Sequence, residues 1–167
     1  MVKESGGWFV MNVKNATWRE NEAFGKRCYF DAEEPFPQVG IHIFIIEPGK
    51  PNARYHRENA QEDFLVLAGR CKLLVNDEER ELETWDFVHC PPGVSHIFVG
   101  AGDGPCALLA IGFRPGKDKE ELYYPASALA RRYNAESPRP TSDPEVAYSD
   151  VEPRAKIAAP RWPLAVV

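Results

Sequence analysis

The feature that most restricts the fold is a series of short, β-rich segments separated by glycine- and proline-containing breaks. These segments occupy residues 8–13, 27–30, 39–46, 64–67, 71–75, 85–90, 95–99 and 106–113. Short segments rich in β-branched and aromatic residues, broken at regular intervals by turn residues, are typical of antiparallel sandwiches and barrels. The pattern therefore predicts an all-β fold and disfavours one in which strands and helices alternate.

The last third of the chain has a different character. Residues 128–133 follow a Pro-Ala-Ser sequence, and Leu129 and Tyr133 fall on one helix face at i and i+4, which predicts a short helix. From about Asn134 onward the chain is rich in proline and charge and shows no hydrophobic period. We expect an extended arm that lies over the barrel or over a partner subunit.

Composition excludes several classes of function. The chain has 167 residues and a net charge of −5, and it contains no run of Lys or Arg that would suit nucleic acid or an anionic membrane. No apolar stretch approaches the roughly 20 residues of a membrane span. The start of the sequence lacks a signal-peptide pattern, and the four cysteines form no Cys-x-x-Cys pair. These features predict a cytoplasmic protein with free thiols and no nucleic-acid or membrane partner.

Two segments contain the residues suited to chemistry. If His56 and Glu58 lie on a strand, their side chains share one face, and a short turn can bring Glu62 to the same side. In the second segment, the turn at residues 91–93 would direct His96 back towards them. Two nitrogen and two oxygen ligands at one point suit a divalent first-row ion such as Zn, Mn, Fe or Ni. We therefore predict a metal site formed by His56, Glu58, Glu62 and His96.

Charge supports the same interpretation. Without a cation, two buried carboxylates would repel each other at a cost of several kcal/mol or would have to be protonated. The role of Glu58 stays open between two alternatives. It is either the fourth ligand, which we favour, or a base beside a site of two histidines and the Glu62 carboxylate. With both carboxylates bound, the centre would be formally neutral.

Three further residues are expected near this centre. Phe64 is in phase with Glu62 and Phe98 is in phase with His96, so both are predicted to line the pocket. Their alternative role, as plain barrel core, predicts the same placement. His42 alternates with Phe44, and it borders the pocket if that face of its strand points inwards.

The sequence resembles the cupin superfamily, whose members carry two motifs. The first motif has a glycine, His-x-His, a glutamate three or four residues later and a glycine six residues further on. The second has a glycine, Pro-x-Gly, a histidine three residues later and often an asparagine four beyond. This sequence matches six of these positions: His56, Glu62, Gly69, Pro91, Gly93 and His96. The resemblance covers roughly residues 39–113.

The sequence departs from the family pattern at three positions. Glu58 replaces the second histidine of the first motif, Trp85 stands where a glycine opens the second motif, and Gly100 stands where an asparagine often closes it. The change at Glu58 alters the metal site itself. The other two changes concern the turns.

The resemblance implies a double-stranded β-helix, or cupin jelly-roll barrel, with a short C-terminal helix and an extended arm. We expect one domain with N-terminal strands in residues 1–38, a barrel core in 39–115, and the helix and arm in 116–167. The N-terminal strands would pack on the barrel or on a partner subunit. Because resembling proteins are often dimers, the chain is predicted to be a homodimer.

The combination of metal ligands with a mostly apolar pocket predicts a metal-dependent enzyme that acts on a small organic molecule. Dioxygenase, isomerase, decarboxylase and lyase reactions all occur on resembling scaffolds, and the first of these would make the protein an oxidoreductase. The alternative is a cupin that binds a metal or a metabolite and catalyses nothing. The sequence does not choose among these activities.

Overall fold

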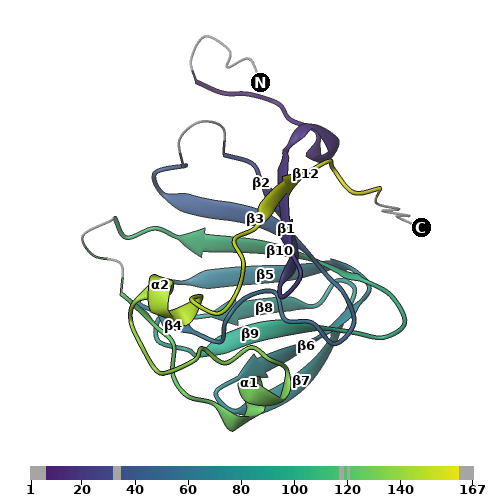
Figure 1. The fold of residues 1–167 in the computed structure, drawn as a ribbon. Helices are drawn as coiled ribbons and strands as arrows, with labels where there is room; N and C mark the ends of the chain where they lie inside the picture. The colour runs from purple at the N-terminus through teal and green to yellow at the C-terminus, as the bar shows by residue number, and fades with distance from the viewer. Residues whose placement is uncertain (1–6, 32–34, 117–118, 120, 162–167) are drawn as a thin grey trace.

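The computed structural model describes residues 7–31, 35–116, 119 and 121–161. Two antiparallel sheets stack to form a jelly-roll barrel, which confirms the predicted fold class (Figure 1). The larger sheet has the order β12-β1-β2-β3-β10-β5-β8, the smaller one has the order β7-β6-β9, and β11 and β4 form a separate pair. The strands are β1 (Thr17–Asn21), β2 (Gly25–Tyr29), β3 (Val39–Ile46), β4 (Arg57–Glu58), β5 (Glu62–Ala68), β6 (Arg70–Val75), β7 (Glu78–Glu83), β8 (Phe87–Cys90), β9 (His96–Ala101), β10 (Cys106–Phe113), β11 (Leu122–Tyr123) and β12 (Ala155–Ile157).

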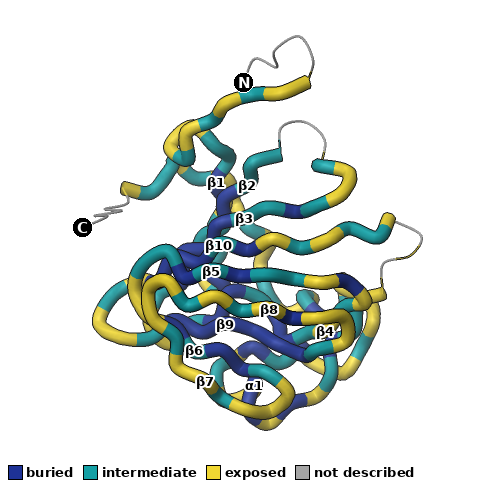
Figure 2. The backbone as a smooth tube through the Cα atoms, turned by 180° about the vertical axis from the view of Figure 1, so that it is seen from behind, coloured by how far each residue is buried: buried dark blue, intermediate teal, exposed yellow. Residues whose placement is uncertain are grey.

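The barrel interior is the main hydrophobic core. Apolar side chains from the facing sides of both sheets meet there because alternate residues of each strand point inwards. Buried strands run through the centre of the molecule, whereas exposed positions lie in its loops and on edge strands such as β7 (Figure 2). The buried members of this core are Phe44, Ile46, Phe64, Val66, Cys71, Leu73, Cys90, Phe98, Cys106, Leu108 and Ala110.

The outer faces of both sheets are covered as well. Trp18, Cys28, Ile43 and Ile45 form a second core behind the larger sheet. Helix α1 (Ala128–Arg132) covers the back of the smaller sheet, where Leu129 joins a third core. Because both faces of β3 are buried, its sequence is almost continuously apolar.

The first predicted strand, at residues 8–13, is wrong. Residues 8–12 form no strand, and a 3-10 helix η1 (Val13–Asn15) follows them. The side chain of Asn12 accepts a hydrogen bond from the Lys14 amide, and Trp18 Nε1 donates to Val13 O at 3.0 Å. These local bonds favour a turn over an extended strand, and the first strand begins at Thr17.

A turn of only two residues joins β6 and β7. Strand β7 already begins at Glu78, which pairs with Val75 of β6. Only Asn76 and Asp77 turn, with φ values of 45° and 64°. Two successive positive φ values are typical of the tight hairpin turn that Asn and Asp favour.

The C-terminal part of the chain packs against the barrel of the same chain. Strand β12 pairs with β1, and helix α2 (Pro144–Ala147), which the sequence did not predict, lies near β4 in Figure 1. The buried side chain of Arg54 binds this segment through Ala147 O and Asp150. No helix in the described residues is long and apolar enough to cross a membrane.

Candidate metal centre

Backbone pairing brings the two sequence segments together. His56 directly precedes β4, and His96 is the first residue of β9. The two residues form an antiparallel bridge in which each amide donates to the other's carbonyl, at 3.3 and 2.8 Å. Glu62, the first residue of β5, lies in the larger sheet. The site therefore lies where both sheets meet the β4 segment.

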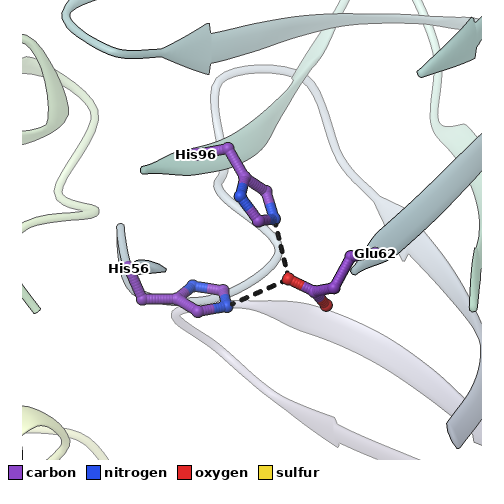
Figure 3. A group of neighbouring side chains, drawn as sticks. All are labelled: His56, Glu62 and His96. Carbon is purple, nitrogen blue, oxygen red and sulfur yellow. Dashed lines mark ion pairs between the residues drawn. The ribbon is translucent and has the colours of Figure 1, made fainter. Parts of the chain in front are cut away.

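The side chains of these three residues converge. His96 Nε2 is 3.0 Å and His56 Nε2 is 3.7 Å from the same Glu62 oxygen, Oε2 (Figure 3). One ligand atom from each of the three residues lies within 4.8 Å of the others. The His96 side chain is only 3% exposed, and those of His56 and Glu62 are 17% and 15% exposed. This group could hold a metal ion.

The backbone fixes the orientation of both imidazole rings. His56 Nδ1 is 2.8 Å from Arg54 O, and His96 Nδ1 is 3.0 Å from Val94 O. A carbonyl can only accept, so each Nδ1 carries a proton and donates it. In a neutral ring Nε2 then keeps its lone pair, and both Nε2 atoms face the centre. Metal-binding histidines in proteins are commonly held by such a bond from the other ring nitrogen.

Glu62 Oε2 is an unusual atom in this arrangement. It is buried and accepts no well-formed hydrogen bond from any described residue, although His96 Nε2 is close. Burial alone would raise the pKa of Glu62. The two imidazoles lower this pKa by more than burial raises it, so the carboxylate stays ionised. Burial lowers the pKa of His96, whereas Cys90 and Glu62 raise it, to about 10. A metal ion at this centre would displace the proton held there.

Glu58 lies at the edge of the group. Its Oε1 is 3.9 Å from His56 Nε2, and its side chain is 15% exposed. It does not join the three residues whose ligand atoms all lie within 4.8 Å of one another. Glu58 nevertheless lines the same cavity as they do. Its role as a ligand stays a prediction.

The centre opens into a cavity of about 280 Å³. Phe64, Phe98 and His42 line this cavity. The Phe64 ring lies 5.3 Å from the His96 ring and 4.5 Å from the Phe98 ring, measured between centroids. These rings form an apolar wall beside the charged centre, and the volume suits a small organic molecule.

Several cavity residues were not found from the sequence, and four of them carry an aromatic hydroxyl or a guanidinium group. Tyr124, beyond β11, is 3% exposed, and its ring lies 6.0 Å from the His56 ring. Tyr148, Arg27 and Arg114 also line the cavity. All four lie outside both motifs, and no spacing in the sequence connects them with the centre. Only the pairing of distant segments brings them there.

None of the four cysteines belongs to the group of His56, Glu62 and His96. Cys90 pairs with Glu62 across β5 and β8, and its thiol interacts with His96. All four cysteines are free and buried, and burial raises the pKa of Cys28 to about 12. The Cys28 thiol is therefore kept in its protonated, unreactive form.

Comparison with known proteins identifies the class of this fold. Residues 42–112 match the family model for the cupin domain, and the structure resembles solved cupins. The fold is therefore that of a cupin jelly-roll barrel. No curated protein matches the sequence.

Two solved structures, the first two described here, agree on the fold. A sugar phosphate isomerase of the cupin superfamily from Silicibacter pomeroyi is 21% identical, with a TM-score of 0.60 over 71% of this chain and 82% of that one. A predicted oxalate decarboxylase from Thermotoga maritima is 17% identical, with a TM-score of 0.56 over 63% and 98%. A candidate sugar phosphate isomerase from Acidithiobacillus ferrooxidans is 30% identical, with a TM-score of 0.47, and the match spans 51% of this chain and 55% of that one.

Proposed function

We propose that the protein is a metal-dependent enzyme that acts on a small organic molecule in the barrel cavity. The observation that carries this proposal is the buried Glu62 Oε2, which lies between two imidazole nitrogens without a well-formed hydrogen bond. A buried acceptor in that position is costly unless a cation or a proton compensates it. Two nitrogen ligands and a carboxylate fit a divalent ion such as Zn, Fe, Mn or Ni.

The residues of the cavity have distinct roles in this proposal. His56, Glu62 and His96 would hold the ion, which when bound supplies Lewis-acid or redox chemistry. The carbonyls of Arg54 and Val94 orient the two rings, so the ligand nitrogens are fixed before binding. Phe64 and Phe98 exclude water from one side of the site, which strengthens electrostatic interactions there.

Similar structures support catalysis without choosing a reaction. The neighbour from S. pomeroyi is named a sugar phosphate isomerase and the one from T. maritima a predicted oxalate decarboxylase. One barrel type therefore serves different reactions, and the substrate depends on the side chains of each cavity.

Metal content tests the ligand set. Purified wild-type protein supplied with a divalent ion and then dialysed is expected to retain about one equivalent, measured by mass spectrometry. His96→Ala and Glu62→Gln each remove a ligand and are expected to lower metal affinity at least about 100-fold. Glu62→Gln keeps the shape of the side chain, so it separates loss of metal from loss of folding.

His89→Ala is the matched control, because His89 is half-exposed and pairs with Asp63 outside the cavity. It should retain the wild-type metal content. The proposal is wrong if the wild type holds less than about a tenth of an equivalent that added metal does not restore. It is equally wrong if Glu62→Gln binds metal as tightly as the wild type does.

Glu58→Gln separates the two roles of Glu58. If Glu58 accepts a proton during the reaction, the variant keeps its metal and loses turnover by about 100-fold or more. If Glu58 is a ligand, metal content falls with activity. Metal content and initial rates are measured on the same sample, with Glu81→Gln as the control on an exposed strand position. Unchanged metal and unchanged rate would exclude both roles.

A further inference from the structure

The cavity has a cationic end opposite the metal centre. Arg27 of β2 and Arg114, which follows β10, line the same cavity as His56 and Glu62. Neither arginine belongs to the metal-ligand motifs. Two guanidinium groups in one small cavity need a reason, because buried charge is costly unless it is paired.

Glycines leave open space between the two ends. Across the sheet, Gly40 of β3 pairs with Gly112 of β10, and Gly112 pairs with Glu62 of β5. A Cβ added to Gly40 would lie 3.2 Å from Arg114 Nη2, and one added to Gly112 would lie 3.5 Å from Glu62 Oε1. Two strand spacings separate Gly40 from Glu62, or about 10 Å. The floor between the arginine and the carboxylate therefore has no side chain to fill it.

Arg27 has a hydrogen-bond donor with no partner. Its guanidinium carbon lies 4.9 Å from the centre of the Tyr29 ring and 5.3 Å from that of the Phe44 ring, which hold the group in place. Its Nε is buried and has no hydrogen-bond partner, and Arg27 forms no ion pair with the described residues. A buried donor without a partner destabilises the free protein. An anionic ligand would supply the missing acceptor.

Arg114 is only partly neutralised. It donates to Phe36 O at 2.5 Å, and its Nη2 is 3.7 Å from Asp31 Oδ2. His42, beside both arginines, adds no charge near neutral pH, because burial and then Arg27 lower its pKa to about 3. Two guanidinium groups face one carboxylate, that of Asp31, and the Arg154 guanidinium lies close enough to act on both Arg27 and His42, so this end of the cavity is net positive.

We infer that the cavity binds a small organic anion whose carboxylate or phosphate group contacts Arg27 and Arg114. The opposite end of the molecule then lies over Gly40 and Gly112 and reaches Glu62 and the two histidines. Arginine is suited to this task because its planar, forked donors match carboxylate and phosphate oxygens. The contact with Glu62 and the two histidines rests on the proposed function, whereas the contact with the two arginines does not.

Calorimetric titration of the full-length, metal-loaded protein tests this inference. The probes are glycerol 3-phosphate for phosphate esters, glutarate for carboxylates, and glycerol as the neutral control. At least one anion is expected to bind in the millimolar range or more tightly. Arg27→Gln and Arg114→Gln should each weaken that binding by about tenfold or more, because each removes a charge-assisted contact. Arg27→Lys keeps the charge without the forked donors and should fall between the wild type and Arg27→Gln.

Arg19→Gln is the matched control. Arg19 is exposed, lies outside the cavity and is the cross-strand neighbour of Arg27, so its loss changes net charge equally. Anion binding should be unchanged in this variant. The inference is overturned if neither anion binds, if glycerol binds as well as the anions do, or if Arg19→Gln weakens binding as much as Arg27→Gln.

A metal-free variant distinguishes this inference from the proposed function. In His56→Ala, anion binding that persists and still depends on Arg27 supports the cationic end even if the metal centre fails. Wild-type protein that binds its metal but neither anion overturns the inference and leaves the metal centre standing. Binding of glycerol 3-phosphate alone or of glutarate alone supports the inference and assigns the ligand to phosphate esters or to carboxylates.

Discussion

The side chain of Glu62 faces two imidazole rings on one side and the bare backbone of Gly112 on the other. Because Gly112 has no side chain, the cavity continues directly from the carboxylate. A larger residue there would approach Glu62 Oε1 to 3.5 Å and narrow this passage. Glu62 is thus the residue that connects the centre with the rest of the cavity.

Trp85 shows why the family pattern has a glycine at its position. Its φ is 79°, in the left-handed region that glycine adopts without strain. The Trp85 amide donates to Val66 O at 2.8 Å, which holds this conformation. Trp85 therefore keeps the left-handed turn before β8, at the cost of backbone strain, and it does not line the cavity.

His42 predicts a pH dependence of stability. Its pKa is lowered from 6.5 to about 3 in the folded protein, by burial and then by Arg27. Between these values the unfolded chain binds a proton that the folded protein excludes, so stability falls as pH drops below about 6.5. The loss due to His42 is at most about 1.4 kcal/mol per pH unit.

Urea unfolding of the wild type and of His42→Gln between neutral and mildly acidic pH measures this effect. The wild type should lose more stability on acidification than the variant, because glutamine does not titrate. His89→Gln, at a half-exposed position, should follow the wild type. If the free energy of unfolding changed with pH equally in the wild type and in His42→Gln, His42 would not be held in its neutral form.

At the scale of elements, a buried arginine is one of the contacts that hold the C-terminal segment to the barrel, besides the pairing of β12 with β1. Arg54 is 4% exposed, and its guanidinium donates to Ala147 O at 3.1 Å and to Asn134 O at 3.2 Å. Its own carbonyl accepts from His56 Nδ1. The residue therefore links the arm to the orientation of a candidate ligand.

Arg54→Ala is expected to destabilise the protein by about 2–4 kcal/mol, because it leaves buried carbonyls without donors. Arg70→Ala is the control, since Arg70 is exposed and its pair with Glu81 should contribute less than about 1 kcal/mol. Urea unfolding measures both. If Arg54→Ala lowered the free energy of unfolding no more than Arg70→Ala does, the C-terminal arm would not depend on the contacts of Arg54.

Elements with buried faces were predicted well from the sequence. Strands β3 and β10 have the predicted bounds, because their apolar residues pack against cores and their ends are marked by turn residues. The strand predicted at residues 8–13 is absent, because only the sequence composition suggested it. Trp8 and Val10 are exposed and pack against none of the described cores. Composition predicts a strand reliably only where a neighbouring strand and a core are present.

At the scale of the whole molecule, the cavity is assembled from parts that lie far apart in the sequence. The motif positions of His56, Glu62 and His96 could be recognised because the family spacing is local. Tyr124 and Arg27 could not, because they reach the cavity through the pairings of β11 with β4 and of β2 with β3. The homodimer predicted from the resemblance stays a prediction.

The two ends of the cavity also differ in charge. With an ion bound, Glu58 and Glu62 would balance its charge, whereas Arg27 and Arg114 leave the other end positive. An anionic molecule would therefore be oriented in one direction on entry. This polarity distinguishes the cavity from a uniformly apolar pocket.

The most direct test of the metal centre is anomalous diffraction from crystals of the protein grown with a divalent first-row ion. We expect one anomalous peak above the ion's absorption edge, within coordination distance of His56 Nε2, His96 Nε2 and Glu62, at about 2.0–2.3 Å. Crystals of His89→Ala should show the same peak, and crystals of Glu62→Gln should not. A peak at a different place, or no peak in wild-type crystals that contain the ion in their solvent, would contradict the account.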